Sequence, residues 1–327
     1  MHSIIPVAGF GTRMRPHTYT QPKVLLPVAG KPILGHILDR LIAAGVTSTT
    51  IVVGYLGDKV EEYVRRAYPE LESSFVEQKE LLGLGHSIWT AREYIPKNGD
   101  PLFIILGDTI FDVNLKNVFN LPTSALCVRP VEDSRRFGVA ELEGGYISKL
   151  VEKPEHPTSN LAIVGLYFFR DPKLLAECLD HIVSNDIRTR NEYQLTDALQ
   201  LMIDRGEKFS TFEIEAWYDC GKPETLLETN RHLLGLKQQG HVGLKGSLIV
   251  DPVEIAEGVE ITNSVIGPYV SIGAGSVVRN TVVRDSIVGE NCSLSNLNLD
   301  LSIVGNNAQA VRRPTVLNLG DSTSIEL

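Results

Sequence analysis

Two glycines and two basic residues near the start of the chain have the types and spacing of a phosphate site. Gly9 and Gly11 lie in the run VAGFGTR after a short apolar stretch, and Arg13 and Lys23 follow. A strand that ends in a glycine-rich turn directs backbone N–H groups at an anion, and glycine lets the chain approach a phosphate closely. No GK[ST] follows, and no third glycine has the dinucleotide-binding spacing. On spacing alone, an ordinary tight turn also explains the two glycines.

An acidic residue occupies a second position where chemistry is expected. Asp108 follows Gly107 at the end of the apolar run LFIIL, residues 102–106. Ligands of α/β sheets bind at the carboxyl ends of the strands. A carboxylate there suits Mg²⁺ beside phosphates, although a simple turn residue is the alternative.

The elements that must position these residues alternate between strand and helix. Apolar patterns predict strands at 3–7, 50–53 and 102–106, with helices at 32–44 and 59–67 between them. This order is typical of an α/β fold, a Rossmann-like parallel sheet covered by helices. Further along, strands at 125–131, 139–142, 146–151, 162–169 and 209–217 and helices at 174–183 and 195–204 predict that the sheet is mixed.

The pattern changes after residue 240. Apolar residues recur every six positions in four runs: Ile249, Ile255 and Ile261; Ile266, Ile272 and Val278; Val282, Val288 and Leu294; Val304 and Ala310. A hexapeptide period predicts a parallel β-helix in which each sixth residue points into the interior. The phase slips between runs, as expected for loose corners; a β-sandwich with a chance period is the alternative. We therefore expect a catalytic domain at 1–222, a helical connector at 223–240 and a β-helix domain at 241–327.

Bulk composition excludes several classes of protein. The net charge of −9 argues against broad nucleic-acid binding, which needs a basic face. No apolar run approaches the roughly 20 residues that cross a bilayer. The four cysteines are far apart and indicate free thiols in a reducing compartment. These features predict a cytoplasmic protein without a membrane or nucleic-acid partner.

The longer string IIPVAGFGTRMRPHTYTQPKVLLPVAGKP closely resembles the sugar-1-phosphate nucleotidylyltransferases, whose signature is a glycine-rich G-T-R turn followed by P-K. The resemblance, which continues to Gly221, implies a Mg²⁺-dependent enzyme that forms an NDP-sugar and pyrophosphate from a nucleoside triphosphate and a sugar-1-phosphate. It also implies that the repeats form a left-handed β-helix. One departure is Ala8, where many members have glycine.

The resemblance assigns roles to residues that match local motifs. Ala8, Gly9, Gly11 and Thr12 bind the triphosphate, and Arg13 and Lys23 act on the reacting phosphates. Asp108 and Asp219, the latter in the segment WYDCG, hold the metal. Gln78 and Gly83 contact the base, since a glutamine amide offers one donor and one acceptor to thymine or uracil. Gly138, Glu152, Lys153, Asn160, Gly165, Arg190 and Glu192 bind the sugar phosphate.

Substrate choice is less sharply defined. The middle segments favour glucose-1-phosphate with dTTP or UTP, ahead of mannose-1-phosphate with GTP. A bifunctional uridylyl- and acetyltransferase pairs the same two kinds of domain, and some non-catalytic assembly subunits share the architecture. We expect the β-helix to serve homo-oligomerisation.

Overall fold

The computed structural model describes residues 1–237, 246–313, 316 and 318–324. The chain divides into two compact units. The first comprises Met1–Pro27 and Lys31–Thr229, and the second comprises Val28–Gly30 and Asn230–Leu327. The end of the predicted connector and the first residues of the predicted repeat domain, 238–245, lie outside the described residues.

A nine-stranded mixed sheet organises the first unit. Its main path runs β10 (Tyr146–Glu152), β9 (Gly138–Glu143), β11 (Leu161–Phe169), β6 (Leu102–Ile105), β1 (His2–Pro6), β4 (Ser48–Val53) and β5 (Glu72–Glu77), while β8 (Ser124–Pro130) pairs with β11 and with β12 (Phe209–Phe212). Strands β6, β1, β4 and β5 are parallel, and β11 runs antiparallel to β6. The Rossmann-like mixed sheet predicted from the sequence is confirmed.

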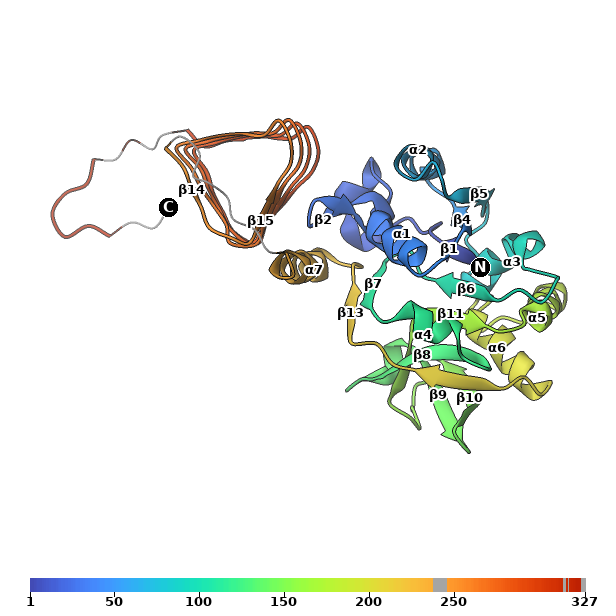
Figure 1. The fold of residues 1–327 in the computed structure, drawn as a ribbon. Coiled ribbons are helices and arrows are strands. Elements are labelled where there is room, and N and C mark those ends of the chain that lie inside the picture. Colours follow the sequence, from blue (N-terminus) through green and yellow to red (C-terminus); the bar gives the residue numbers. More distant parts are fainter. Residues whose placement is uncertain (238–245, 314–315, 317, 325–327) are drawn as a thin grey trace. The chain divides into compact units, whose positions relative to one another are not determined.

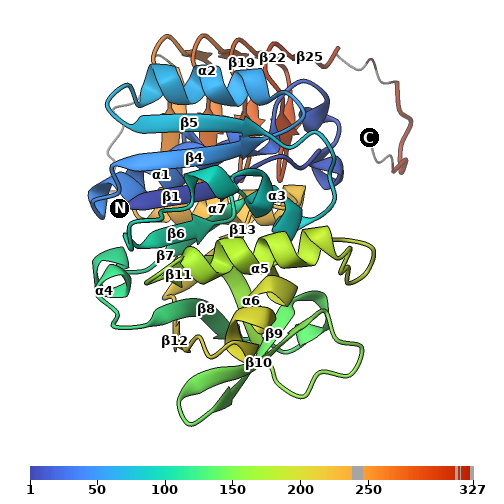
Figure 2. The same cartoon turned by 90° about the vertical axis from the view of Figure 1, so that its right-hand side faces the viewer.

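Helices cover both faces of this sheet. They are α1 (Ile33–Ala43), α2 (Gly57–Ala67), α3 (Leu84–Thr90), α4 (Leu115–Phe119), α5 (Lys173–Ser184) and α6 (Leu195–Asp204). Helices α3, α5 and α6 pack together on one face, with α1 on the other (Figures 1 and 2). Leu102 and Ile104 of β6 share one buried apolar core with residues of these three helices. Short 3₁₀ helices span Thr12–Met14, His17–Tyr19, Lys23–Leu25, Arg92–Tyr94 and Ser134–Arg136.

The single strand predicted at 209–217 is wrong. The chain forms β12 in the main sheet and then β13 (Ala216–Asp219), which pairs antiparallel with β7 (Thr109–Asp112) in a separate two-stranded sheet. The charged residues Glu213 and Glu215 separate the two strands. Another two-stranded pairing joins β2 (Pro27–Val28) to β3 (Lys31–Pro32).

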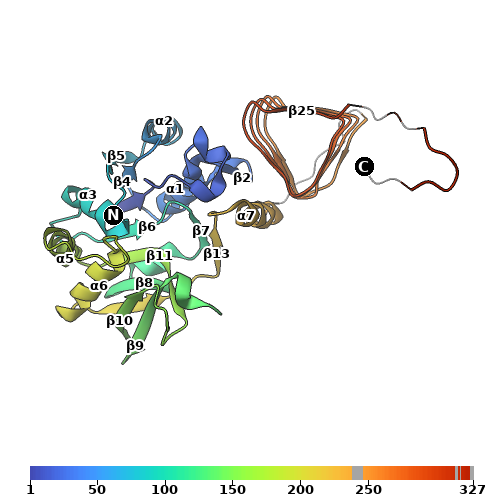
Figure 3. The same cartoon turned by 180° about the vertical axis from the view of Figure 1, so that it is seen from behind.

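The second unit is a parallel β-helix of triangular cross-section (Figures 1 and 3). Four coils of three strands each are formed by β14 (Leu248–Ile249), β15 (Val253–Ile255) and β16 (Glu260–Thr262); β17 (Val265–Ile266), β18 (Val270–Ile272) and β19 (Val277–Arg279); β20 (Val282–Val283), β21 (Ile287–Val288) and β22 (Ser293–Ser295); and β23 (Asn298–Leu299), β24 (Ile303–Val304) and β25 (Gln309–Val311). Corresponding strands stack in parallel register, so that Ile255, Ile272, Val288 and Val304 form one column. This is the architecture that the hexapeptide period predicted.

One predicted interior position of the β-helix is wrong. Val283, not Val282, is fully buried and pairs with Ile266. Neighbouring side chains of a strand point to opposite faces, so a shorter corner before β20 moves the interior position by one residue.

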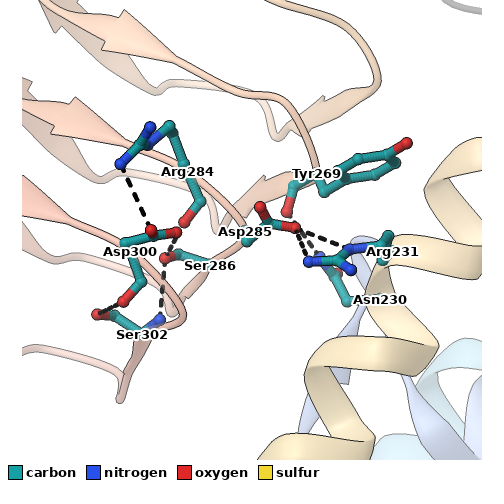
Figure 4. Close-up of polar contacts among 8 residues, drawn as sticks. All are labelled: Asn230, Arg231, Tyr269, Arg284, Asp285, Ser286, Asp300 and Ser302. Atoms are coloured by element: carbon teal, nitrogen blue, oxygen red, sulfur yellow. Dashed lines mark hydrogen bonds and ion pairs between the residues drawn. The ribbon is translucent and has the colours of Figure 1, made fainter.

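Helix α7 (Pro223–Gly235) crosses the division between the units, and its second half is bound to the β-helix. The Asn230 amide donates to the Tyr269 carbonyl at 3.1 Å and accepts from the Ser271 hydroxyl at 2.7 Å and from the Ala29 N–H at 2.8 Å. The Arg231 guanidinium donates twice to one oxygen of Asp285 (Figure 4). Asn230 is 1% exposed, so its bonds fix the start of the second unit.

Polar contacts also join successive coils of the β-helix (Figure 4). The Ser286 hydroxyl donates to the Arg284 carbonyl and accepts from the Ser302 N–H at 3.0 Å, while Arg284 and Asp300 form an ion pair at 3.4 Å. These side-chain contacts add to the parallel backbone pairing of the coils.

Candidate active site

A glycine-rich turn directly follows β1. Gly11 has φ 62°, and a Cβ there would lie 2.9 Å from Thr18 Cγ2 and 3.0 Å from Lys23 Cβ. The Thr18 hydroxyl donates to the Gly11 carbonyl at 2.9 Å, and so does the Met14 N–H at the same distance. The turn is therefore pinned in a conformation that only glycine adopts without strain. By contrast, a Cβ at Gly9 would meet no atom within 4 Å, so the fold leaves open space beside that residue.

The turn forms one wall of a cavity of about 460 Å³. Its lining comprises Pro6, Val7, Ala8, Gly9, Gly11, Thr12, Arg13, Lys23, Val24, Gln78, Leu81, Gly83, Leu84, Ser87, Leu106, Asp108, Glu192 and Gly221. All the predicted triphosphate and base residues belong to this set, together with Asp108 and Glu192. The cavity is thus the place where segments far apart in the sequence meet.

Lys23 and Asp108, which both line the cavity, form an ion pair. Lys23 Nζ lies 2.5 Å from Asp108 Oδ2, and the two side chains are 11% and 34% exposed. The Gly107 N–H donates to the Pro6 carbonyl at 3.3 Å, which holds the end of β6 beside the end of β1. The predicted phosphate-binding cation and the predicted metal ligand are therefore direct neighbours.

The pairing of β7 with β13 brings Asp219 to the same region. Asp219 pairs with Thr109, and the Cys220 N–H donates to the Asp108 carbonyl at 3.0 Å. A Cβ at Gly221 would lie 2.7 Å from Asp219 Oδ1 and 2.9 Å from Arg13 Nη2. Asp219 thus lies behind the cavity-lining Gly221, close to the Arg13 guanidinium.

Two carboxylates are a suitable donor set for Mg²⁺ when substrate phosphates supply further oxygens. Among the residues that the structure describes, no group of three or more His, Cys, Asp or Glu side chains could hold a metal by itself. Burial raises the pKa of the neighbouring Cys220 thiol to about 12.

Gln78, Gly83 and the start of α3 form another part of the wall. Gln78 is 4% exposed and its Nε2 donates to the Gly83 carbonyl at 3.3 Å. Gly83 has φ 111°, and a Cβ there would lie 2.6 Å from the Tyr193 carbonyl. Ser87, which the sequence reasoning missed, is 3% exposed and lines the cavity, and its hydroxyl has no hydrogen-bond partner in the described part of the chain. A lone serine inside a helical pattern gave no signal that could have found it.

Four of the predicted sugar-phosphate residues, Gly138, Glu152, Lys153 and Arg190, form a second cluster. The Glu152 carboxylate pairs with Lys153 Nζ at 3.0 Å and accepts from the Thr196 hydroxyl at 2.7 Å. A Cβ at Gly138 would lie 3.1 Å from Glu152 Oε2, and Arg190 donates to the Lys153 carbonyl at 2.7 Å. Burial, then the charge of Glu152, raises the pKa of Tyr167, so its phenol stays neutral.

The last two predicted residues lie differently. The Gly165 carbonyl accepts from the N–H of cavity-lining Leu106 at 3.0 Å, and a Cβ at Gly165 would lie 2.6 Å from the Leu106 side chain. Gly165 therefore shapes the wall from behind. Asn160 is exposed, and its carbonyl accepts from the Val131 N–H. None of Gly138, Glu152, Lys153, Asn160, Gly165, Arg190 and Asp219 lines the cavity itself.

Known proteins resemble this chain along most of its length. The family model described as nucleotidyl transferase matches residues 2–235. A glucose-1-phosphate thymidylyltransferase of Streptomyces griseus is 32% identical, and the alignment covers 100% of this chain and 99% of that protein. The bifunctional protein GlmU of Methanocaldococcus jannaschii is 32% identical over 98% of this chain and 86% of its own length.

Two further comparisons cover a smaller share of the chain. The UTP–glucose-1-phosphate uridylyltransferase AglF of Haloferax volcanii is 33% identical over 71% of this chain and 96% of its own. A UDP-glucose pyrophosphorylase solved in complex with UDP-glucose superposes with a TM-score of 0.63 and 29% identity, over 72% of this chain and 99% of that one. The chain belongs to the nucleotidyl transferase family and is an enzyme of that family.

Proposed function

We propose that the enzyme joins a nucleoside triphosphate to a sugar-1-phosphate and releases pyrophosphate, with UTP or dTTP and glucose-1-phosphate as its substrates. One observation carries the proposal. A single cavity combines a glycine-rich turn, the Lys23–Asp108 pair and the buried amide of Gln78, which suit a triphosphate, a metal and a base. The names of the relatives support the same class of reaction.

The chemistry requires positioning rather than a protein nucleophile. An oxygen of the sugar phosphate attacks the α-phosphorus, the new P–O bond forms, and the bond from the α-phosphorus to the bridging oxygen breaks to release pyrophosphate. A phosphate monoester loses its second proton near pH 6, so no general base is needed. The site must hold two anions in line, which is an orientational and electrostatic task.

Each side chain has a defined part in this proposal. Arg13 and Lys23 offset the charge that develops on the α-phosphate and on pyrophosphate. Asp108 and Asp219 would hold Mg²⁺, which would supply Lewis-acid polarisation of a phosphoryl oxygen. Glu152 accepts hydrogen bonds from sugar hydroxyls, while Lys153 and Arg190 neutralise the sugar phosphate.

The reverse reaction tests the proposal. Pyrophosphate and Mg²⁺ are added to UDP-glucose, dTDP-glucose or GDP-mannose, and the nucleoside triphosphate formed is measured by chromatography. We expect UTP or dTTP from the glucose nucleotides and little GTP from GDP-mannose. Formation of GTP alone would replace the proposed substrates with mannose-1-phosphate and GTP.

We also infer that the β-helix unit joins copies of the chain. Leu301 and Val311, in or beside the last coil, are each 63% exposed. Light scattering after size-exclusion chromatography should give a multiple of the monomer mass, and this multiple should fall when both residues are changed to Lys. A monomer at micromolar concentration contradicts the inference.

A further inference from the structure

The orientation of the Gln78 amide is fixed by two neighbours. A backbone carbonyl can only accept, so the contact with the Gly83 carbonyl identifies the facing atom of Gln78 as Nε2. The same nitrogen lies 3.1 Å from His86 Nδ1. With both hydrogens of the amide used, the Nδ1 of His86 must be an unprotonated acceptor.

His86 is held in place by its surroundings. Its ring stacks on Trp89 and on Tyr193, with centroids 5.5 and 6.1 Å away. The Gly85 N–H donates to the Tyr193 carbonyl at 2.8 Å, so the loop that carries Tyr193 is fastened to the start of α3. Because these contacts hold the imidazole ring, the ring determines the orientation of the Gln78 amide.

The charges around His86 favour the neutral ring. Burial lowers its pKa below the usual value of 6.5, and the Arg188 guanidinium lowers it further. The Glu80 carboxylate and a hydrogen bond to the Glu80 backbone act in the opposite direction. Two more charged groups reach this region through Trp89: Asp180 accepts from its indole N–H at 2.8 Å, and Arg92 lies over its ring.

We propose that His86 is a positioning residue that makes Gln78 an acceptor-only contact for the nucleotide base. The proposal rests on the proposed function, and it narrows the sequence-based expectation that the amide offers both a donor and an acceptor. With Nε2 occupied, Oε1 is the atom that Gln78 offers to a ligand. Uracil and thymine present an N–H at ring position 3, whereas cytosine presents a lone pair there. His86 therefore contributes to selecting UTP or dTTP against CTP.

The sign of the pH dependence follows from this geometry. Because the pKa of His86 is lowered below 6.5, the ring is mostly neutral at neutral pH and accepts from Gln78, so its contribution to UTP affinity is present there. As the pH falls below 6.5 and through the lowered pKa of His86, Nδ1 gains a proton that opposes the Gln78 N–H, and the affinity falls. The triphosphate also titrates near pH 6, so the informative quantity is the difference between the wild type and a variant without the imidazole.

Calorimetric titration with UTP and with CTP, in Mg²⁺ and without sugar phosphate, tests the proposal. His86→Phe keeps an aromatic ring between Trp89 and Tyr193 but removes the acceptor. His86→Asn restores an acceptor near the Nδ1 position. Trp89→Phe disturbs the same stack without touching the Gln78 contact. We expect His86→Phe to weaken UTP binding about 5- to 10-fold, to reduce the preference for UTP over CTP, and to flatten the pH dependence.

The controls separate positioning from packing. His86→Asn should bind UTP within about 3-fold of the wild type, as should Trp89→Phe. The proposal fails if His86→Phe binds UTP like the wild type, if His86→Asn is no better than His86→Phe, or if Trp89→Phe causes an equal loss. If His86→Phe does not fold, the pH profiles of the wild type and of His86→Asn are compared, and a wild-type profile that loses no more affinity below pH 6.5 than that of His86→Asn overturns the proposal.

Binding and turnover distinguish this proposal from the reaction itself. A wild-type protein that binds UTP in a His86-dependent way but forms no nucleotide sugar leaves the His86 proposal intact and removes the proposed reaction. If the wild type forms UDP-glucose and His86→Phe binds UTP as tightly as the wild type, the proposed reaction stands and the His86 proposal fails. A wild-type protein that binds neither UTP nor dTTP contradicts both.

Discussion

At the scale of single residues, the ion pair between Lys23 and Asp108 explains how a nearly buried lysine can remain charged beside the cavity. The lysine is nearly buried, and burial of an ammonium group without a partner is costly. Asp108 offsets that cost and keeps the cation at the cavity wall, where it would contact the triphosphate in the proposed reaction. Asp108 therefore serves the stability of the site and, in the proposed reaction, binding of the metal.

Removing either carboxylate of the proposed metal site should abolish turnover without unfolding the protein. We expect Asp108→Asn and Asp219→Asn to lower kcat at least roughly 100-fold, because a neutral amide binds Mg²⁺ poorly. Circular dichroism and pyrophosphate release measure fold and turnover. Asp112→Asn, on the same strand as Thr109 but outside the cavity lining, is the matched control and should keep near-normal activity. Near-normal activity in either of the first two variants would remove the metal assignment.

The two glycines of the turn should respond differently to a methyl group. Gly11→Ala forces a side chain into a left-handed conformation against Thr18 and should cost about 1–3 kcal/mol of stability. Gly9→Ala has room for its Cβ and should unfold like the wild type in urea, while its KM for the nucleotide rises. Equal stability losses in the two variants would show that Gly9 also has a structural role.

Local sequence motifs predicted the glycines of the turn and the charged residues of the cavity better than its ion pair and its other lining residues. The glycines, Arg13, Lys23 and Asp108 stand in local motifs, and the structure places all of them on one cavity. The ion pair between Lys23 and Asp108 could not be predicted, since it depends on two strand ends meeting in space. Ser87 and Leu84 were missed because a hydroxyl or an apolar side chain in a helix has no distinctive pattern.

At the scale of elements, periodicity predicted strands and helices, but it did not predict where the chain changes sheet. The division between β12 and β13 carries Asp219 from the main sheet to its pairing with β7, and this arises from long-range strand pairing. The β-helix coils were predicted by their six-residue period, while the shift from Val282 to Val283 depends on corner geometry.

The bonds of α7 to the β-helix allow a prediction about local stability. Asn230→Ala would leave the Ala29 N–H and the Ser271 hydroxyl without the amide oxygen, and should lower the local opening free energy of α7 by about 1–3 kcal/mol. Arg231→Met removes an ion pair in which the arginine side chain is 50% exposed, and should cost less than about 1 kcal/mol. Hydrogen exchange of peptides covering residues 223–235 in the full-length protein measures both. A larger effect from Arg231→Met than from Asn230→Ala would contradict the view that the Asn230 hydrogen bonds hold α7 to the β-helix.

At the scale of the whole molecule, the two units differ in what holds them together. The first has a sheet covered by helices, and the second stacks coils around a narrow apolar interior. Among the described residues, no helix has the length and apolarity of a membrane span. All four cysteines are free and at most 1% exposed, so packing, not disulfides, stabilises both units.

This burial predicts slow thiol chemistry. Burial raises the pKa of Cys178 to about 11 and that of Cys220 to about 12, which removes the reactive thiolate. The native protein should not react with a thiol reagent within minutes, and four thiols should react after denaturation. Prompt reaction of one thiol in the native protein would show that its surroundings open readily.

In the proposed reaction, one enzyme combines a nucleoside triphosphate, bound in the cavity, with a sugar phosphate. The most direct test of this reaction measures pyrophosphate and nucleotide sugar together, for five nucleoside triphosphates against several sugar-1-phosphates in Mg²⁺. We predict equal amounts of the two products, largest for UTP or dTTP with glucose-1-phosphate, and none without a sugar phosphate. Pyrophosphate release that does not need the sugar phosphate, or no release with any pair of substrates, would contradict the account.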